Sequence, residues 1–229
     1  MHIFMKVLLL ALLITNLFAD ITIAKQSQQL LLVTTNDFNN SAASLQAYEK
    51  IEGTWKKVFE EIPVNLGRNG LAWGEGEVNF KHKRSDLIKQ EGDGKAPAGL
   101  FSLDTFFGYE KQDFDFPYLQ ITSQDICVDD SSSKEYNKLI KTDEISSYKS
   151  FEQMRRKDNL YELGIVVGHN KKGIKKAGSC IFIHIQRNVN SPTAGCTSLA
   201  KDKLLKIMKW LKFSKHPVLL QLPYHQKFD

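Results

Sequence analysis

A histidine and a cysteine near the C-terminal end of the chain have residue types and a spacing that suit nucleophilic chemistry. Residues 180 to 198 read CIFIHIQRNVNSPTAGCTS, with His184 in an apolar run and Cys196 after a turn-forming stretch. The eleven residues between them include Asn, Ser, Pro and Gly, which can reverse the chain and return the thiol to the imidazole. An imidazole that takes the thiol proton and later protonates a leaving amine would support acyl transfer through a thioester.

The apolar run at residues 180 to 185 predicts a strand, and its two faces separate the candidate residues. Cys180, Phe182 and His184 share one face with core-facing neighbours, and the three isoleucines share the other. Cys180 lies about 13 Å from His184 along such a strand, because each residue advances the chain ~3.3 Å. Cys196 is therefore the better partner for His184.

The surroundings of Cys196 also favour a reactive thiol. A predicted helix would begin with Thr197 or Ser198 as N-cap, where free amides and the helix dipole lower a thiol pKa. The small residues Ala194 and Gly195 leave backbone amides that can face an oxyanion. Spacing alone keeps a plainer alternative open, namely a satisfied core histidine and a cysteine buried as a small apolar side chain.

The N-terminus has the pattern of a secretory signal peptide. Lys6 precedes an apolar run from Val7 to Phe18, which ends at the small residue Ala19. The run is shorter than the ~20 residues of a membrane-spanning helix, so we expect residues 1–19 to be cleaved, with Ala24 as the other cleavage position. The mature protein would then work in the periplasm or cell wall, with membrane contact only through the signal peptide. Functions that need nucleotides or nucleic acid are not expected there.

The three cysteines, Cys127, Cys180 and Cys196, leave at least one unpaired within a single chain. Outside the cytoplasm a free thiol needs a reason, because that environment oxidises cysteines. Cys127 and Cys180 either form a disulfide or simply lie buried, while Cys196 stays free for chemistry.

Residues 25–229 have the length and pattern of a single domain, which we expect to be β-rich and of the α+β class. The net charge of +5 suits anionic wall polymers and equally suits ordinary solubility. The stretch 55–64, after a turn at 51–53, fits the second strand of a hairpin or a helix. Strands are predicted at 29–34, 45–50, 100–103, 163–167, 180–185 and 217–222, and helices at 135–140 and 199–213.

Five blocks of the chain carry a family resemblance. They are GRNGLAWG at 67–74, EGDGKAPAGLF at 91–101, CVDDSSSKEYN at 127–137, GSCIFIHI at 178–185 and SPTAGCT at 191–197. Together, and in this order, they resemble the L,D-transpeptidase family with a YkuD-like catalytic domain. The likeness spans most of the mature chain, and the GDGKAPAG block combined with the His and Gly-Cys blocks is specific.

The resemblance implies a β-sandwich with a few peripheral helices, whose cysteine attacks the amide after the third residue of a peptidoglycan stem peptide. Cys196 would be the nucleophile, His184 the general acid and base, and the amides of Ala194, Gly195 and Cys196 the oxyanion donors. Water or the amine of another stem would then resolve the thioester. The resemblance implies no metal and no organic cofactor, and we expect a monomer whose partners are peptidoglycan stem peptides.

Two positions depart from the family's usual motif, and both bear on substrate anchoring. Ala194 stands where the family has histidine, and Ser198 stands where an arginine is common. Arg68 and Lys95, in the glycine-containing loops, are candidates for binding a substrate carboxylate, with Thr193 as a further contact. Arg68 and Lys95 could equally be solvated loop charges.

Three other functions remain open. A zinc protein would use His169, Cys180, His184 and Cys196, although their spacing matches no compact zinc motif. A wall-binding module would keep the fold without turnover. Within the enzyme class, an L,D-carboxypeptidase or an amidase on wall-linked peptides would form the same thioester and differ in the nucleophile that resolves it.

Overall fold

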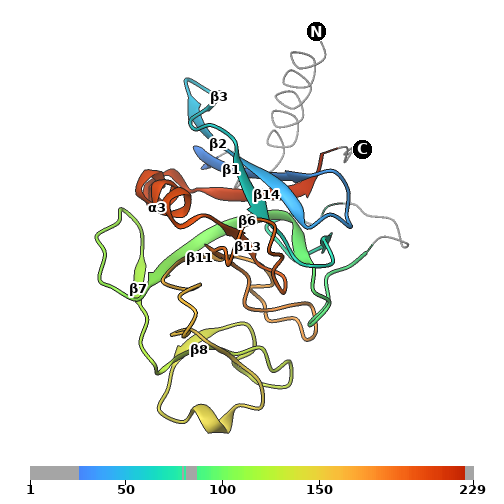
Figure 1. The fold of residues 1–229 in the computed structure, drawn as a ribbon, viewed down its shortest axis with the longest axis vertical. Coiled ribbons are helices and arrows are strands. Elements are labelled where there is room, and N and C mark those ends of the chain that lie inside the picture. Colours follow the sequence, from blue (N-terminus) through green and yellow to red (C-terminus); the bar gives the residue numbers. More distant parts are fainter. Residues whose placement is uncertain (1–25, 79, 81–86, 225–229) are drawn as a thin grey trace.

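The main element of the protein is a closed β-sheet (Figure 1). The computed structural model describes residues 26–78, 80 and 87–224, so the predicted signal peptide lies outside the described residues. Eight strands are hydrogen-bonded in the order β1-β14-β6-β11-β12-β13-β4-β2, and β2 pairs again with β1. The ring has no free edge, so the fold is a barrel. The β-rich class is confirmed, whereas the predicted sandwich is wrong, because β1 joins both ends of the sheet.

The barrel strands are apolar or alternate between apolar and polar residues, as strands with one face in a core require. Their bounds are β1 Gln29–Thr35, β2 Ala42–Ile51, β4 Ile62–Asn65, β6 Ala96–Gly108, β11 Leu163–Val167, β12 Phe182–Ile185, β13 Thr197–Leu199 and β14 Val218–Pro223. The long strand β6 pairs with β14 through its first half and with β11 through its second. A register shift at Val166 and Val167 bends the β6–β11 pair.

Smaller elements surround the barrel. β3 forms a hairpin with β2, whereas β5 and β7 pair with β6. The bounds are β3 Thr54–Lys57, β5 Leu71–Trp73, β7 Tyr118–Gln120, α3 Lys201–Trp210, and the 3-10 turns Ile145–Ser147 and Phe213–Lys215. Within the described residues, no helix combines the length and apolar character needed to span a membrane.

The larger hydrophobic cluster fills the barrel interior, since every barrel strand contributes to it. The contributions include, in chain order, Leu31, Leu45, Val64, Phe101, Ile165, Ile183, Leu199 and Leu219. Leu204, Ile207 and Met208 of α3 join the same cluster. The apolar stripe predicted for this helix therefore packs into the core, and its lysines stay outside.

A second hydrophobic cluster lies on the outer face of the barrel. Because strand residues alternate, Phe182 of β12 points into this cluster while Ile183 points inward. The part of the outer face formed by β6, β11 and β12 is covered by residues 121–161, the covering segment (yellow in Figure 1). This segment contains a three-stranded sheet of β8 Asp125–Cys127, β9 Leu139–Lys141 and β10 Glu152–Gln153.

A disulfide ties the covering segment to the barrel. Cys127 in β8 is bonded to Cys180, two residues before β12, and their Cα atoms are 6.0 Å apart. Of the two alternatives that the sequence left open, the disulfide is the one found. Cys196 is free and buried.

All six predicted strands overlap observed ones, and the differences lie in the helices. The stretch 55–64 forms β3 and β4 rather than a helix. The helix predicted at 135–140 is wrong, because Asn137 adopts a left-handed φ of 64° and its side chain accepts a hydrogen bond from the Cys180 amide. The helix predicted at 199–213 begins only at Lys201, because Leu199 belongs to β13.

Candidate active site

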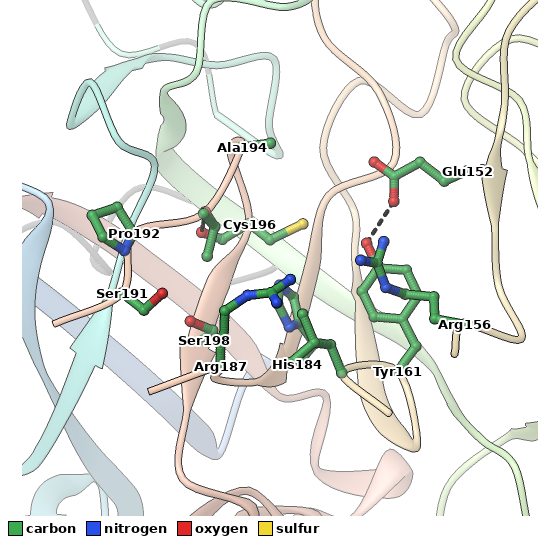
Figure 2. A pocket seen from close by; sticks show the side chains of 12 residues that line it. Glu152, Arg156, Tyr161, His184, Arg187, Ser191, Pro192, Ala194, Cys196 and Ser198 are labelled. Atoms are coloured by element: carbon green, nitrogen blue, oxygen red, sulfur yellow. Dashed lines mark hydrogen bonds between the residues drawn. The ribbon is translucent and has the colours of Figure 1, made fainter. Parts of the chain in front are cut away.

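Cys196 and His184 reach the same cavity from neighbouring strands. β12 and β13 run parallel, with His184 opposite Ser198, so Cys196 immediately precedes β13 on the same side of the sheet. The cavity has a volume of about 240 Å³, and Figure 2 shows the Cys196 sulfur pointing into it. Its lining residues are Glu152, Arg156, Leu160, Tyr161, His184, Arg187, Ser191, Pro192, Thr193, Ala194, Cys196 and Ser198. The structure thus brings the predicted nucleophile and base to one site.

The Cys196 thiol is held in a neutral state by its surroundings. The Phe182 amide donates to Sγ at 3.3 Å, and Sγ lies 3.5 Å from the Cys180 carbonyl oxygen, which it can donate to. Burial, followed by the nearby charge of Glu152, raises the thiol pKa to about 12. The predicted activation by a helix N-terminus is wrong, because Thr197 and Ser198 lie in β13 and the helix cap is Ala200.

His184 has one ring nitrogen committed and the other available. Nδ1 lies 2.8 Å from the Ile185 carbonyl oxygen, which can only accept, so Nδ1 carries the proton. Burial lowers the His184 pKa to about 4, and the ring is therefore neutral at pH 7. Nε2 is then unprotonated and can act as a base. The Tyr161 ring packs edge-on against the imidazole, with centroids 5.2 Å apart.

The loop before Cys196 is shaped by Thr193. Its hydroxyl donates to the Cys196 carbonyl at 2.6 Å and accepts from the Gly195 amide at 3.1 Å. In this conformation the Gly195 amide donates to Thr193, and its predicted role as an oxyanion donor stays a prediction. Among the described residues, the amides of Ala194 and Cys196 have no hydrogen-bond partner, so they remain the candidate oxyanion donors. Thr193 lines the cavity, but its hydroxyl serves the loop.

Arg68 and Lys95 support this loop without lining the cavity. The Arg68 amide donates to the Thr193 carbonyl at 2.9 Å. The Lys95 ammonium donates to the Asn69 carbonyl, and a Cβ on Gly195 would come within 3.0 Å of the Lys95 carbonyl oxygen. The glycine loops therefore position Cys196 through their backbones. The predicted carboxylate contacts of Arg68 and Lys95 are not placed at the cavity.

Four polar cavity residues outside the motif blocks were not predicted from the sequence: Glu152, Arg156, Tyr161 and Arg187. The Tyr161 hydroxyl donates to Glu152, and the Arg156 guanidinium lies over the Tyr161 ring, 4.9 Å from its centroid (Figure 2). Three of the four come from the end of the covering segment, which has no local motif that would mark them. Ser198, which stands where an arginine is common in the family motif, has a buried hydroxyl without a hydrogen-bond partner among the described residues.

Two of the four ligands that a zinc protein would need, Cys180 and His169, are not available at the Cys196 cavity. Cys180 is held in the disulfide and has no thiolate to offer. His169 does not line the Cys196 cavity, and its Nε2 lies 3.0 Å from the Ala177 carbonyl. In the part of the chain that the structure describes, no group of three or more His, Cys, Asp or Glu residues could hold a metal ion.

Fold and site together define a closed β-barrel protein in which one free, buried cysteine and a neutral imidazole line the same small, charged cavity. No protein-family model and no curated protein sequence matches this chain. A solved structure, the helical cell shape determining protein Pgp2 from Campylobacter jejuni, is similar to it with a TM-score of 0.44 and 15% sequence identity. The match covers 94% of this chain and 56% of that one, so this chain spans little more than half of its length.

Proposed function

We propose that the protein is an exported cysteine acyltransferase of the L,D-transpeptidase type that acts on peptidoglycan stem peptides. The observation that carries the proposal is the meeting of the one free thiol and a neutral imidazole in a single cavity. The motif blocks GDGKAPAG and SPTAGC, which resemble those of the L,D-transpeptidase family, support this family and substrate class. The signal-peptide pattern supports work in the periplasm or wall.

The acylation step follows from the protonation states of the two side chains. As the Cys196 sulfur attacks the substrate carbonyl, its proton passes to His184 Nε2, and the C–S bond forms while the carbonyl becomes an oxyanion. The amides of Ala194 and Cys196 are available to hold that oxyanion. The C–N bond then breaks, and the His184 imidazolium returns the proton to the leaving amine. A thioester remains on Cys196.

The bond between His184 Nδ1 and Ile185 has a defined part in this step. It fixes the tautomer and the ring orientation, as a backbone acceptor does for other catalytic histidines. A ring that is neutral at pH 7 is competent to accept a proton. A thiol that is neutral at rest avoids an unpaired anion in a buried site and loses its proton only during attack.

The second half of the reaction decides the product. A stem amine that attacks the thioester gives a cross-link, whereas water gives a shortened stem peptide. Incubation of purified mature protein with a defined tetrapeptide stem, followed by mass spectrometry, separates the two. We expect loss of the fourth residue with the wild type and none with Cys196→Ala. Wall binding by both proteins with no product from either would instead indicate a binding module.

A further inference from the structure

A second cavity lies on the outer face of the barrel, between the covering segment and strands β6, β7, β11 and β12. Its volume is about 500 Å³, against about 240 Å³ for the Cys196 cavity, and the two cavities share no lining residue. Cavities of ~300–1,000 Å³ are the usual size of small-molecule sites. Acyl transfer at Cys196 leaves the second cavity without a role, and its lining indicates which ligand would fit.

Much of the wall of the second cavity is apolar. Val166 of β11 and Phe182 of β12 are paired across the two strands, so both side chains leave the barrel on the same face. Leu119 of β7 and Leu139 of β9 add apolar side chains from the opposite elements. Val166 and the two leucines are only partly buried, although they pack on the buried cluster of the outer face. The second cavity therefore presents apolar surface that a hydrophobic group would cover with a gain in free energy.

The polar part of this wall has one carboxylate more than its cation can neutralise. Lys171 lines the second cavity and pairs with two carboxylates at once, with Asp104 at 3.1 Å and with Glu77 at 3.0 Å. Neither carboxylate has a further ion pair among the described residues. Asp104 Oδ1 also accepts from the Ser102 hydroxyl at 2.7 Å, whereas Asp104 Oδ2 accepts no hydrogen bond within the described part of the chain. One negative charge is therefore left over at the cavity wall.

Gly168 leaves room beside the free oxygen of Asp104. It lines the second cavity, and a Cβ built on it would come within 2.2 Å of the Ser102 hydroxyl and 3.0 Å of Asp104 Oδ2. The oxygen thus lies next to a backbone without a side chain, where an ammonium group has space to donate to it. Such charge-assisted hydrogen bonds are among the stronger ones in proteins. An anionic ligand would instead meet two carboxylates, Asp104 and Glu77, around the single ammonium of Lys171.

We propose that the second cavity is a ligand site for an amphiphilic cation, whose ammonium group binds Asp104 and whose apolar body packs on Val166 and Phe182. The site goes beyond the proposed acyl transfer and does not depend on it. It is nevertheless close to the nucleophile, because the Phe182 amide donates to the Cys196 sulfur at 3.3 Å. An occupant of the second cavity therefore contacts a residue whose backbone holds the thiol.

Three octyl compounds that differ only in the head group test the charge preference at pH 7. Octylammonium is the cation, octanol is neutral and octanoate is the anion. By calorimetry, we expect the wild type to bind octylammonium about 10-fold more tightly than octanol and to bind octanoate most weakly. Asp104→Asn should remove the advantage of octylammonium over octanol. Glu60→Gln, which changes an exposed carboxylate outside the cavity, should keep it. Equal affinities for the three compounds, tighter binding of octanoate, or an unchanged preference in Asp104→Asn would overturn the site.

Further variants separate the second cavity from the Cys196 cavity, where Glu152 is another carboxylate that could attract a cation. Val166→Trp fills the second cavity from β11, and Leu119→Trp fills it from β7. Each should abolish binding of octylammonium, with urea unfolding as the check on the fold. Glu152→Gln should leave that binding unchanged. Octylammonium binding that survives in the folded tryptophan variants, or that is lost in Glu152→Gln, would overturn the assignment to the second cavity.

Discussion

Cys196 and His184 are both buried and both uncharged at rest, because burial disfavours thiolate and imidazolium alike. This differs from a thiolate–imidazolium pair, in which the nucleophile is ionised before substrate arrives. In the proposed mechanism, the proton would leave the thiol only during the attack. The sequence identified both residues, but the helix dipole expected to activate the thiol is absent at Cys196, because a strand and not a helix follows it.

The pKa of Cys196 has a direct consequence for alkylation. Folded protein should react with iodoacetamide slowly up to about pH 9, and the rate should rise only as the pH approaches the raised pKa of about 12. In urea the same thiol should titrate near its ordinary value of about 8.5. Intact-mass measurement of the modified fraction against pH gives both curves. A folded-state midpoint at the urea value would contradict the neutral, buried thiol.

His184 should matter for the rate far more than for stability. His184→Asn removes the basic Nε2, while the asparagine amide, at the position of Nδ1, can still donate to the Ile185 carbonyl. We expect acylation of Cys196 to slow by about 10²- to 10⁴-fold, which is the usual contribution of a general base. Quenched-flow mass spectrometry measures the rate, and urea unfolding checks the fold. Acylation at the wild-type rate in this variant would remove His184 from the mechanism.

At the scale of elements, the site depends on the pairing of β11, β12 and β13. Gly164 in β11 lies opposite His184, and a Cβ there would approach the Phe107 ring to 2.2 Å. Phe107 packs against Tyr161 and Phe182, so the missing side chain at Gly164 leaves room for the aromatic cluster behind the imidazole.

Gly164→Ala tests this packing. The added methyl must displace the Phe107 ring, and we expect a loss of about 1–3 kcal/mol in the free energy of unfolding, as for other overpacked cores. Urea denaturation gives the value. The double variant Gly164→Ala with Phe107→Leu should lose less free energy of unfolding than the two single variants lose in sum, because the smaller leucine removes the clash. Strict additivity of the two changes would show that Phe107 is not the constraint.

At the scale of the whole molecule, the site is assembled from the barrel and the covering segment, which one disulfide cross-links. The barrel supplies Cys196 and His184, and the covering segment supplies Glu152, Arg156 and Tyr161. The Cys127–Cys180 disulfide joins the parts across 53 residues of sequence, and the Cys180 carbonyl lies beside the Cys196 thiol. Loss of the disulfide should therefore affect both stability and the site.

We expect the paired variant Cys127→Ser with Cys180→Ser to lose about 4 kcal/mol in the free energy of unfolding, from the loop-closure entropy of a link across 53 residues. Its activity should also fall, because Glu152, Arg156 and Tyr161 are held less firmly. Urea unfolding with and without dithiothreitol provides the comparison, and the paired variant should not respond to the reductant. Wild-type stability that is indifferent to reduction would contradict this account.

The sequence predicted the parts of the molecule whose signals are local. Apolar runs located six strands, and the spacing from His184 to Cys196 correctly indicated that the two side chains reach one site. Closure of the barrel was missed, because it depends on β1 pairing with strands from both ends of the chain. The charged cavity wall was missed for the same reason: Glu152 and Arg187 are separated in sequence and meet only through tertiary contacts.

Intact-mass spectrometry of the mature protein with a carbapenem as acylating agent tests most directly whether Cys196 forms a covalent acyl-enzyme. We predict a single added mass equal to one opened carbapenem in the wild type, mapped by peptide digestion to Cys196. The same mass should be absent from Cys196→Ala and should appear in the control Lys111→Gln, which changes an exposed residue outside the cavity. An adduct that persists in Cys196→Ala would contradict the assignment of the nucleophile.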